Sequence, residues 1–425
     1  MSNFWQRKVA REDAGTDIVP DNTELPLESV EGVLSEVASD TAVIDQQDNE
    51  AALLTEDADE TDAQYEAIDA DVKAADAGEE GVEEDIPEDA VEQIDVAQES
   101  VRRRWGLNNR QTLARESYGT ANRRKAVRES LWDDIKAFFR RIWEWLKAQG
   151  RKIKDRWINF HNQGKTIQKR SKKFDAAIRQ LGSIKSGQDE LKGGFIKQLS
   201  VGGKFVGSDT NVLNAQLAKV GTLPAAVEAL LKEGQEQVEE LTATRVATES
   251  KKKNKGNKPG AAVVQEIVQE KAREFSTGMT ELLGSQAVKV EGEGDDYSIS
   301  LVESEKDVET EVKTPAIAAM NSINTFYNKL GIEVEKRAKA YEKINGDREK
   351  FESAIEKLLA KIDKIDAKDD TAYIDLIRST RRDVSNISTV VGVMERVQAS
   401  TITYLSSGVN GYLSAAIGAY DKRKS

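Results

Sequence analysis

Residues 131–160 read LWDDIKAFFRRIWEWLKAQGRKIKDRWINF, and this stretch decides the class of fold. Its apolar residues recur at steps of three, four or seven, the spacing of one face of an α-helix. That face consists of Leu131, Ile135, Phe138, Ile142, Leu146, Ile153, Trp157 and Phe160. The opposite face carries Lys136, Arg140, Lys147, Arg151 and Lys154. We therefore expect one long, basic, amphipathic helix, with Ser130 as its N-cap.

Helical patterns continue towards the C-terminus. Pro224 favours the start of a helix over 224–248, and another helix is expected over 262–275. From Thr314 onward, apolar faces predict helical elements that are separated at Asn345-Gly346-Asp347 and Asp369-Asp370 and run to Tyr420. Several helices with short connections predict an antiparallel bundle.

One segment has the alternation of a β-hairpin. Residues 287–301 place two alternating stretches on either side of a Gly292 and Gly294 turn. We therefore predict a mainly α fold with one short β-hairpin.

Charge divides the chain sharply. Residues 1–100 carry four basic and 31 acidic side chains, whereas residues 101–200 carry 26 basic and nine acidic ones. High net charge with few aromatic residues predicts that the acidic N-terminal arm is disordered. An acidic arm beside a basic segment also predicts masking of one by the other.

These observations predict four regions. An acidic, disordered arm or propeptide covers 1–99, and a basic, Trp-rich helical segment covers 100–182. A helical middle region covers 183–313 and includes a Lys-rich linker at 251–260 as well as the hairpin. The helical bundle covers 314–425.

The composition argues against catalysis. The chain has no cysteine and one histidine, His161, which excludes thiolate and multi-histidine metal sites. Gly164-Lys165-Thr166 ends like a phosphate-binding loop, but Asn159 stands where the first glycine belongs and no strand precedes it. We predict no catalytic residue, metal, cofactor or small-molecule substrate.

The basic segment carries the strongest functional signal. Positive charge is clustered with aromatic residues, which suits neutralisation of phosphates with release of counterions. No base-reading motif is present, so we expect non-specific, salt-sensitive binding of DNA. The predicted phosphate contacts are Arg102, Arg103, Arg104, Arg110, Arg123, Arg124, Lys125 and Arg128. A solvated basic face that binds nothing specific is the plain alternative.

The acidic and basic regions meet at Ala97-Gln98-Glu99, followed by Ser100. This layout resembles the internal head (inner capsid) proteins of large-genome tailed bacteriophages. In that family the prohead protease removes a propeptide after a small residue, any residue and Glu. The resemblance implies a helical protein of the capsid interior that is packaged with genomic DNA, cut after Glu99, and in contact with capsid or scaffold proteins.

The cleavage triplet is common, so its position carries the argument. We expect Ala77-Gly78-Glu79, Ala90-Val91-Glu92 and Ala97-Gln98-Glu99, and also Ala114-Arg115-Glu116, to be accessible as extended chain, whereas triplets inside helices are shielded.

Two other functions remain open on the sequence. One is a nucleic-acid-binding adaptor whose acidic tail is retained and autoinhibitory. The other is a membrane-active protein that uses the amphipathic helix 131–160. The polar residues between Val397 and Tyr420 disfavour a membrane span there.

Overall fold

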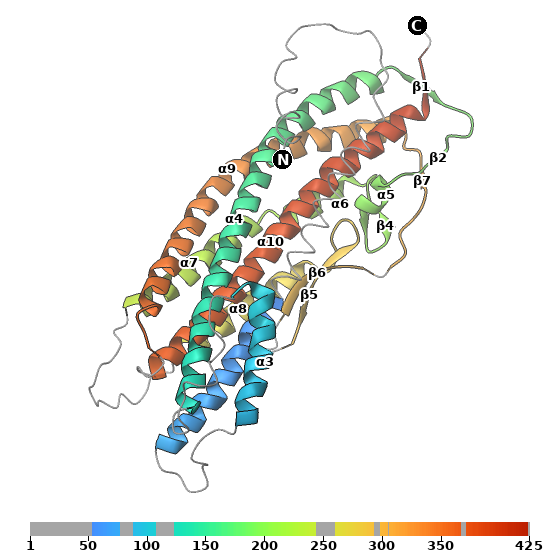
Figure 1. Ribbon diagram of the computed structural model, residues 1–425. Coiled ribbons are helices and arrows are strands. Elements are labelled where there is room, and N and C mark those ends of the chain that lie inside the picture. Colours follow the sequence, from blue (N-terminus) through green and yellow to red (C-terminus); the bar gives the residue numbers. More distant parts are fainter. Residues whose placement is uncertain are drawn as a thin grey trace, which may run out of the picture.

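A computed structural model describes residues 53–76, 88–107, 123–243, 260–292, 298–304, 306–366 and 371–423. Inside the helices, the side chains of 88–90, 92, 95, 149, 152–162, 260–267 and 371–372 lie outside the description, and these include His161. Long helices run side by side through an elongated molecule (Figure 1). The predicted mainly α fold is confirmed.

Helix α4 (Arg123–Ile178) contains the predicted amphipathic helix and extends beyond it at both ends. It packs along α9 (Ile317–Ile362). Because α4 begins at Arg123, Ser130 lies inside the helix and is not its N-cap; its hydroxyl instead accepts a hydrogen bond from Arg102 Nη2 at 2.9 Å. The apolar face is buried at Leu131, Trp132, Ile135, Phe138, Phe139, Ile142 and Leu146.

The C-terminal region forms two long helices rather than the three or four shorter ones that the sequence predicts. Helix α9 passes through the predicted turn at Asn345-Gly346-Asp347 without interruption, and α10 (Thr371–Gly418) includes most of the stretch from Val397 to Tyr420. A glycine in a helix costs only about 1 kcal/mol. Burial continues across that turn signal, where Arg348 pairs with Glu395 of α10 at 2.6 Å. Tertiary packing therefore outweighs the local signal.

Two predicted helices of the middle region are present. Helix α7 (Leu223–Ala243) has Pro224 as its second residue and packs against α9 and α10, and α8 (Gly260–Gly278) packs against α10. The shorter helices α5 (Phe195–Gln198) and α6 (Thr210–Lys219) precede them. Most of the predicted Lys-rich linker, 251–259, lies outside the described residues.

The predicted hairpin is confirmed, and it is not the only strand pair. Strand β5 (Gln286–Glu291) pairs antiparallel with β6 (Ser298–Glu303), with Val288 opposite Leu301. Within the described part of the chain, three further antiparallel ladders are very short, and two of them join segments far apart in the sequence. They are β1 (Leu181–Ile184) with β8 (Tyr420–Lys422), β2 (Glu190–Leu191) with β7 (Val312–Lys313), and β3 (Ser200–Val201) with β4 (Lys204–Phe205).

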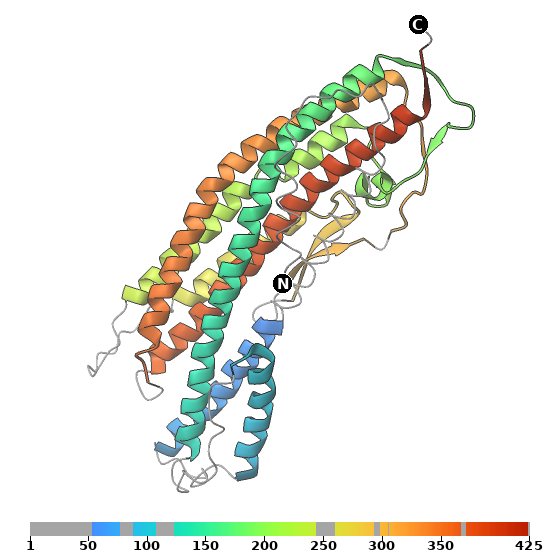
Figure 2. The same ribbon diagram turned by 45° about the horizontal axis from the view of Figure 1, so that its top comes forward.

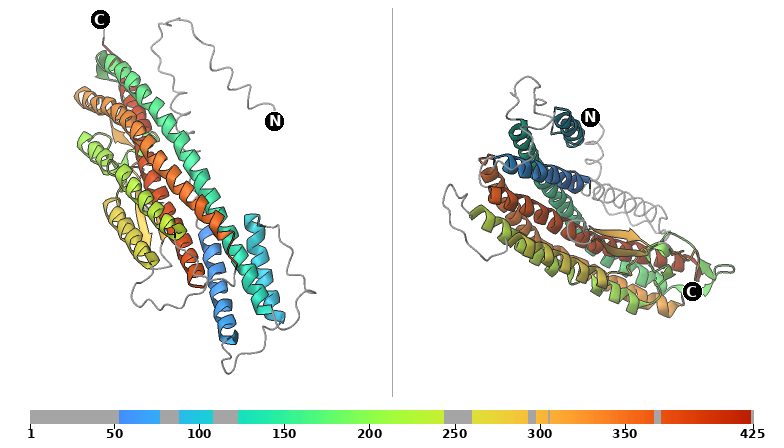
Figure 3. Two further views of the ribbon diagram at one scale, coloured as in Figure 1. Left: turned by 90° about the vertical axis from the view of Figure 1, so that its left-hand side faces the viewer. Right: turned by 90° about the horizontal axis from the view of Figure 1, so that it is seen from below.

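Part of the acidic arm is helical, which corrects the expectation of disorder for those residues. Residues 53–76 form a helix, called the arm helix below, and α3 (Glu88–Trp105) continues across the predicted boundary at Ser100. Both lie beside the N-terminal half of α4 (Figures 2 and 3). The arm helix buries Leu54, Ala58, Tyr65 and Val72, and its acids meet cationic partners. Residues 1–52 and 77–87 lie outside the described residues.

Candidate nucleic-acid interface

The arm helix inserts its acids among cations from three other helices. Asp57 faces α3, Asp69 faces α4, and Asp62 faces α10. Among the described residues, four of the cations predicted to contact phosphate, Arg104, Arg124, Lys125 and Arg128, pair with the arm helix. Thus the basic segment of the sequence and part of its acidic arm meet in space, as charge masking predicts.

The pairs with α3 centre on Asp57, whose side chain is 7% exposed. Arg104 Nη1 donates to its two carboxylate oxygens at 3.0 and 2.9 Å. The indole Nε1 of Trp105 donates to Oδ2 at 2.6 Å. This carboxylate therefore receives charge-assisted and neutral hydrogen bonds together, an arrangement that holds it in place.

The pairs with α4 involve the C-terminal turns of the arm helix. Arg124 Nε donates to Asp71 at 2.6 Å, Arg128 Nη1 donates to Asp69 at 3.2 Å, and Lys125 Nζ lies 3.0 Å from Asp76. Arg124 and Arg128 are largely buried, whereas Lys125 and Asp76 are both half-exposed. The two arginine pairs are the stronger anchors, because breaking either one leaves a largely buried guanidinium without its anion, whereas exposed pairs contribute little.

The remaining predicted contacts lie elsewhere. Arg102 Nε binds the buried carboxylate of Asp134 on α4 at 3.0 and 3.1 Å, so it links α3 to α4. Arg103 is exposed and pairs with Glu99 one turn earlier in α3. Arg123 is half-buried at the start of α4. Arg110 lies outside the described residues.

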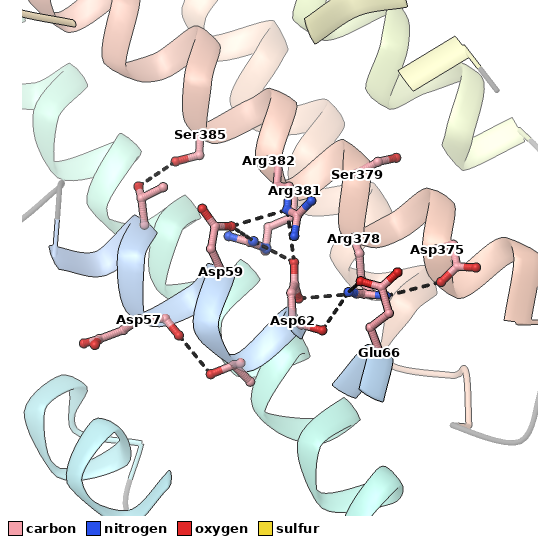
Figure 4. Close-up of polar contacts among 12 residues, drawn as sticks. Asp57, Asp59, Asp62, Glu66, Asp375, Arg378, Ser379, Arg381, Arg382 and Ser385 are labelled. Carbon is pink, nitrogen blue, oxygen red and sulfur yellow. Dashed lines mark hydrogen bonds and ion pairs between the residues drawn. The ribbon is translucent and has the colours of Figure 1, made fainter. Parts of the chain in front are cut away.

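Three arginines of α10 extend this surface, and none of them is among the predicted phosphate contacts. Arg381 Nη2 donates to Asp59 and, at 2.7 Å, to Asp62 (Figure 4). Arg378 Nη2 donates to the backbone carbonyl of Asp62 at 2.7 Å, and Arg382 lies 3.4 Å from Asp59. Positions 378, 381 and 382 share one helix face, which is the signal that was available in the sequence.

Apolar and aromatic contacts complete the docking of the arm helix. The Tyr65 ring lies 6.1 Å from the Trp132 ring of α4, between centroids, and the Arg378 guanidinium stacks over Tyr65 at 5.4 Å. Burial, together with the nearby Asp69 carboxylate, raises the pKa of the Tyr65 hydroxyl. The arm helix is thus packed as well as ion-paired.

The predicted cleavage triplet is not extended, which corrects an expectation. Ala97, Gln98 and Glu99 lie inside α3, as do residues 90–92. Gln98 is 2% exposed, and its Nε2 donates to Gln64 Oε1 of the arm helix at 2.7 Å. A protease needs α3 to unwind before it can bind this segment in extended form. The triplets at 77–79 and 114–116 lie outside the described residues.

The phosphate-loop resemblance at Gly164-Lys165-Thr166 has a packing explanation. These residues are helical within α4. A Cβ on Gly164 would lie 2.8 Å from the backbone oxygen of Gly331, so this glycine lets α4 and α9 approach closely. Across the described residues, acidic and histidine side chains nowhere gather into a group that could hold a metal ion. In the same residues, no helix is long and apolar enough to span a membrane.

The fold and this surface define an elongated helical protein that holds an acidic helix against arginine and lysine side chains of three other helices. The chain belongs to the family of phiKZ-like phage internal head proteins, which it matches over residues 39–417. It is therefore a structural protein of the virion, located inside the phage capsid. This match confirms the resemblance seen in the sequence and includes the arm helix. No curated protein and no solved structure matches the chain.

Proposed function

We propose that this internal head protein associates non-specifically with phage genomic DNA through α3 and α4 after its acidic N-terminal segment has been removed. The observation that carries the proposal is the set of ion pairs between the arm helix and Arg104, Arg124, Lys125 and Arg128. Each carboxylate pairs with a cation that we assign to a phosphate once the arm helix has left. The same cations bind either the arm or DNA, but not both.

The charge balance supports the direction of this switch. Residues 1–99 carry four basic and 31 acidic side chains, so their removal changes the formal net charge from −13 to +14. A cationic chain gains affinity for DNA by releasing condensed counterions, whereas an anionic chain is repelled. Removal of the segment therefore changes the sign of the long-range interaction as well as uncovering the contacts.

In this proposal the prohead protease supplies the cut, after Glu99 or after another Ala-x-Glu triplet of the N-terminal region. A cut after Glu99 requires α3 to unwind and Gln98 to leave Gln64. Processing there belongs to a stage at which α3 is not yet docked. Capsid or scaffold proteins are the other proposed partners, and we assign no catalytic role to the chain.

A second candidate keeps the acidic segment permanently as an autoinhibitory element. Two observations favour it: Gln98 is buried inside α3, and the family match begins at residue 39, well before the arm helix. In this case DNA competes with an attached arm and binds weakly. The membrane-active alternative lacks such support, because the apolar face of α4 from Leu131 to Leu146 is used in the core.

DNA binding tests the proposal. A labelled duplex of arbitrary sequence is titrated with the full chain and with a chain cut by a specific protease whose site is inserted between Val82 and Glu83. We expect tight binding only after the acidic fragment leaves, with affinity that falls steeply between about 50 and 200 mM salt. Equal binding by the intact and cut chains would contradict the masking.

Variants of the cut chain locate the contacts. Arg104→Ala, Lys125→Ala and Arg128→Ala together should lower the slope of log affinity against log salt by up to about 2.7, at about 0.9 per lost contact. An unchanged slope would mean that these three side chains touch no phosphate.

A further inference from the structure

We propose that Arg378, Arg381 and Arg382 of α10 form a binding site for backbone phosphates of DNA, which Asp59 and Asp62 of the arm helix occupy until the acidic segment leaves. The inference rests on the proposed function and extends it to α10, whose first residue lies 189 residues beyond the end of the basic segment at 182. These arginines were not among the predicted phosphate contacts.

The three arginines surround an anion and form a binding site for it, which we call the socket. The Asp62 side chain is fully buried, and the Arg381 side chain beside it is equally buried. Arg378 is 8% exposed and Arg382 is 29% exposed, so the cluster opens towards Arg382. Figure 4 shows the three guanidinium groups directed at the carboxylates of the arm helix. Arginine is suited to this role because its planar fork matches carboxylate and phosphate oxygens.

The carboxylates do not use all the donors of the socket. Arg381 Nε and Nη1 are buried and have no hydrogen-bond acceptor among the described residues. Arg381 donates through Nη2 alone, to Asp59 and Asp62. A phosphate group offers more acceptor oxygens in a tetrahedral arrangement than a planar carboxylate does. Asp62 Oδ1 is also buried without a hydrogen-bond partner among the described residues, so the mismatch is one of acceptor direction rather than acceptor number. The unused donors therefore point to an oxyanion whose acceptors are arranged differently from those of the present carboxylates.

Removal of the arm helix takes both anionic partners away from the Arg381 guanidinium. The carboxylates that pair with Arg381 both come from the arm helix, whereas Arg378 also has Asp375 of its own helix at 3.3 Å. A buried guanidinium without an anion is costly. Once the arm helix leaves, the charge of Arg381 has to be compensated by another anion or by water.

The site is continuous with the predicted DNA surface. Tyr65 of the arm helix lies against Arg378 of α10 on one side and Trp132 of α4 on the other. The next turn of the same helix places Asp69 on Arg128. A polyanion that replaces the arm helix therefore meets the cations of α4 and α10 together.

The test uses the full chain with the protease site between Val82 and Glu83. After cutting, the acidic fragment is removed in high salt, and rebinding of that purified fragment shows that the remaining chain is folded. Duplex DNA is then titrated into the parent and into Arg378→Gln/Arg382→Gln. Arg381 is left intact because its burial makes it a folding risk. Arg179→Gln/Arg423→Gln, two exposed arginines near β1 and β8, is the matched control for charge.

We expect Arg378→Gln/Arg382→Gln to lower the salt slope by up to about 1.8, and the control to leave it unchanged. Saturating DNA should also prevent the acidic fragment from rebinding. Inorganic phosphate at the same phosphate concentration is the second probe, and it should compete far more weakly. Equal competition would assign the site to free phosphate and overturn the proposal for DNA.

Two further outcomes separate this inference from the proposed function. One outcome is that Arg378→Gln/Arg382→Gln has the same slope of log affinity against log salt as the parent, while the triple variant at Arg104, Lys125 and Arg128 has a lower slope. In that case the proposed DNA binding stands and the α10 site is wrong. If the cut parent shows no salt-dependent binding, the proposed function and this inference both fail. DNA that binds without displacing the fragment would make the α10 arginines a purely structural socket.

Discussion

Asp62→Asn gives the sharpest test of how the arm helix is held. The substitution keeps the size of the side chain but removes the charge that faces Arg381 at 2.7 Å and Arg378 Nε at 3.6 Å. Removing one partner of a buried ion pair typically costs about 3–5 kcal/mol, because the other charge remains buried without compensation. Since Arg381 has Asp59 as a second partner, we expect the lower end, about 3 kcal/mol.

Native-state hydrogen exchange measures this cost locally. Amides of residues 53–76 should exchange roughly 100-fold faster in Asp62→Asn, as about 3 kcal/mol of opening free energy implies. Amides in α7 and α9 should be unchanged, and these serve as the internal check on the rest of the fold.

Glu66→Gln is the matched control. Glu66 also faces Arg378, at 3.5 Å, but its side chain is 73% exposed. Exposed pairs contribute about 0–1 kcal/mol, so exchange of the arm helix should change little. If Asp62→Asn and Glu66→Gln accelerate exchange equally, the buried carboxylate is not what holds the arm helix, and the reasoning is refuted.

Two further predictions concern the bundle. Burial raises the pKa of Asp383 to about 7, although Gln237 and the Arg382 charge oppose the shift. The folded state therefore holds a proton that the unfolded state releases near pH 4, so stability should fall as pH rises from about 4 to 7, by about 2–4 kcal/mol. Asp383→Asn should abolish most of this pH dependence in urea unfolding, and a retained slope would contradict it. Gly164→Ala should lower the free energy of unfolding by about 1–3 kcal/mol, because its Cβ meets backbone of α9. Gly392→Ala, whose Cβ meets nothing within 4 Å, should be neutral or stabilising, and equal effects of the two would refute the packing argument.

The sequence predicted those elements whose signals are local. The buried face of α4 follows directly from its apolar period, and the hairpin of β5 and β6 follows from its alternation around Gly292. Pro224 placed the start of α7 within one residue. Local turn signals failed inside α9, because the buried pair of Arg348 and Glu395 and its surrounding core support a continuous helix.

The candidate site was predictable only in part. The cations of α3 and α4 are clustered in the sequence, so their role as a charged surface could be expected. The α10 arginines are separated from Asp59 and Asp62 by about 320 residues, and nothing local indicates that they meet. The arm helix was missed because its four buried apolar residues are thinly spaced among acids, a composition typical of disorder. Neutralisation by distant arginines makes its folding possible.

The central claim is that the arm helix leaves the cationic surface when DNA takes its place. Quantitative mass spectrometry of purified particles tests this most directly, with peptides from residues 53–76 compared with peptides from α9 and α10. We predict that both sets are equimolar in proheads, and that the 53–76 peptides are absent from DNA-filled heads, where the chain begins after one of the Ala-x-Glu triplets. Equimolar 53–76 peptides in DNA-filled heads would contradict the account and establish the arm as a permanent part of the protein.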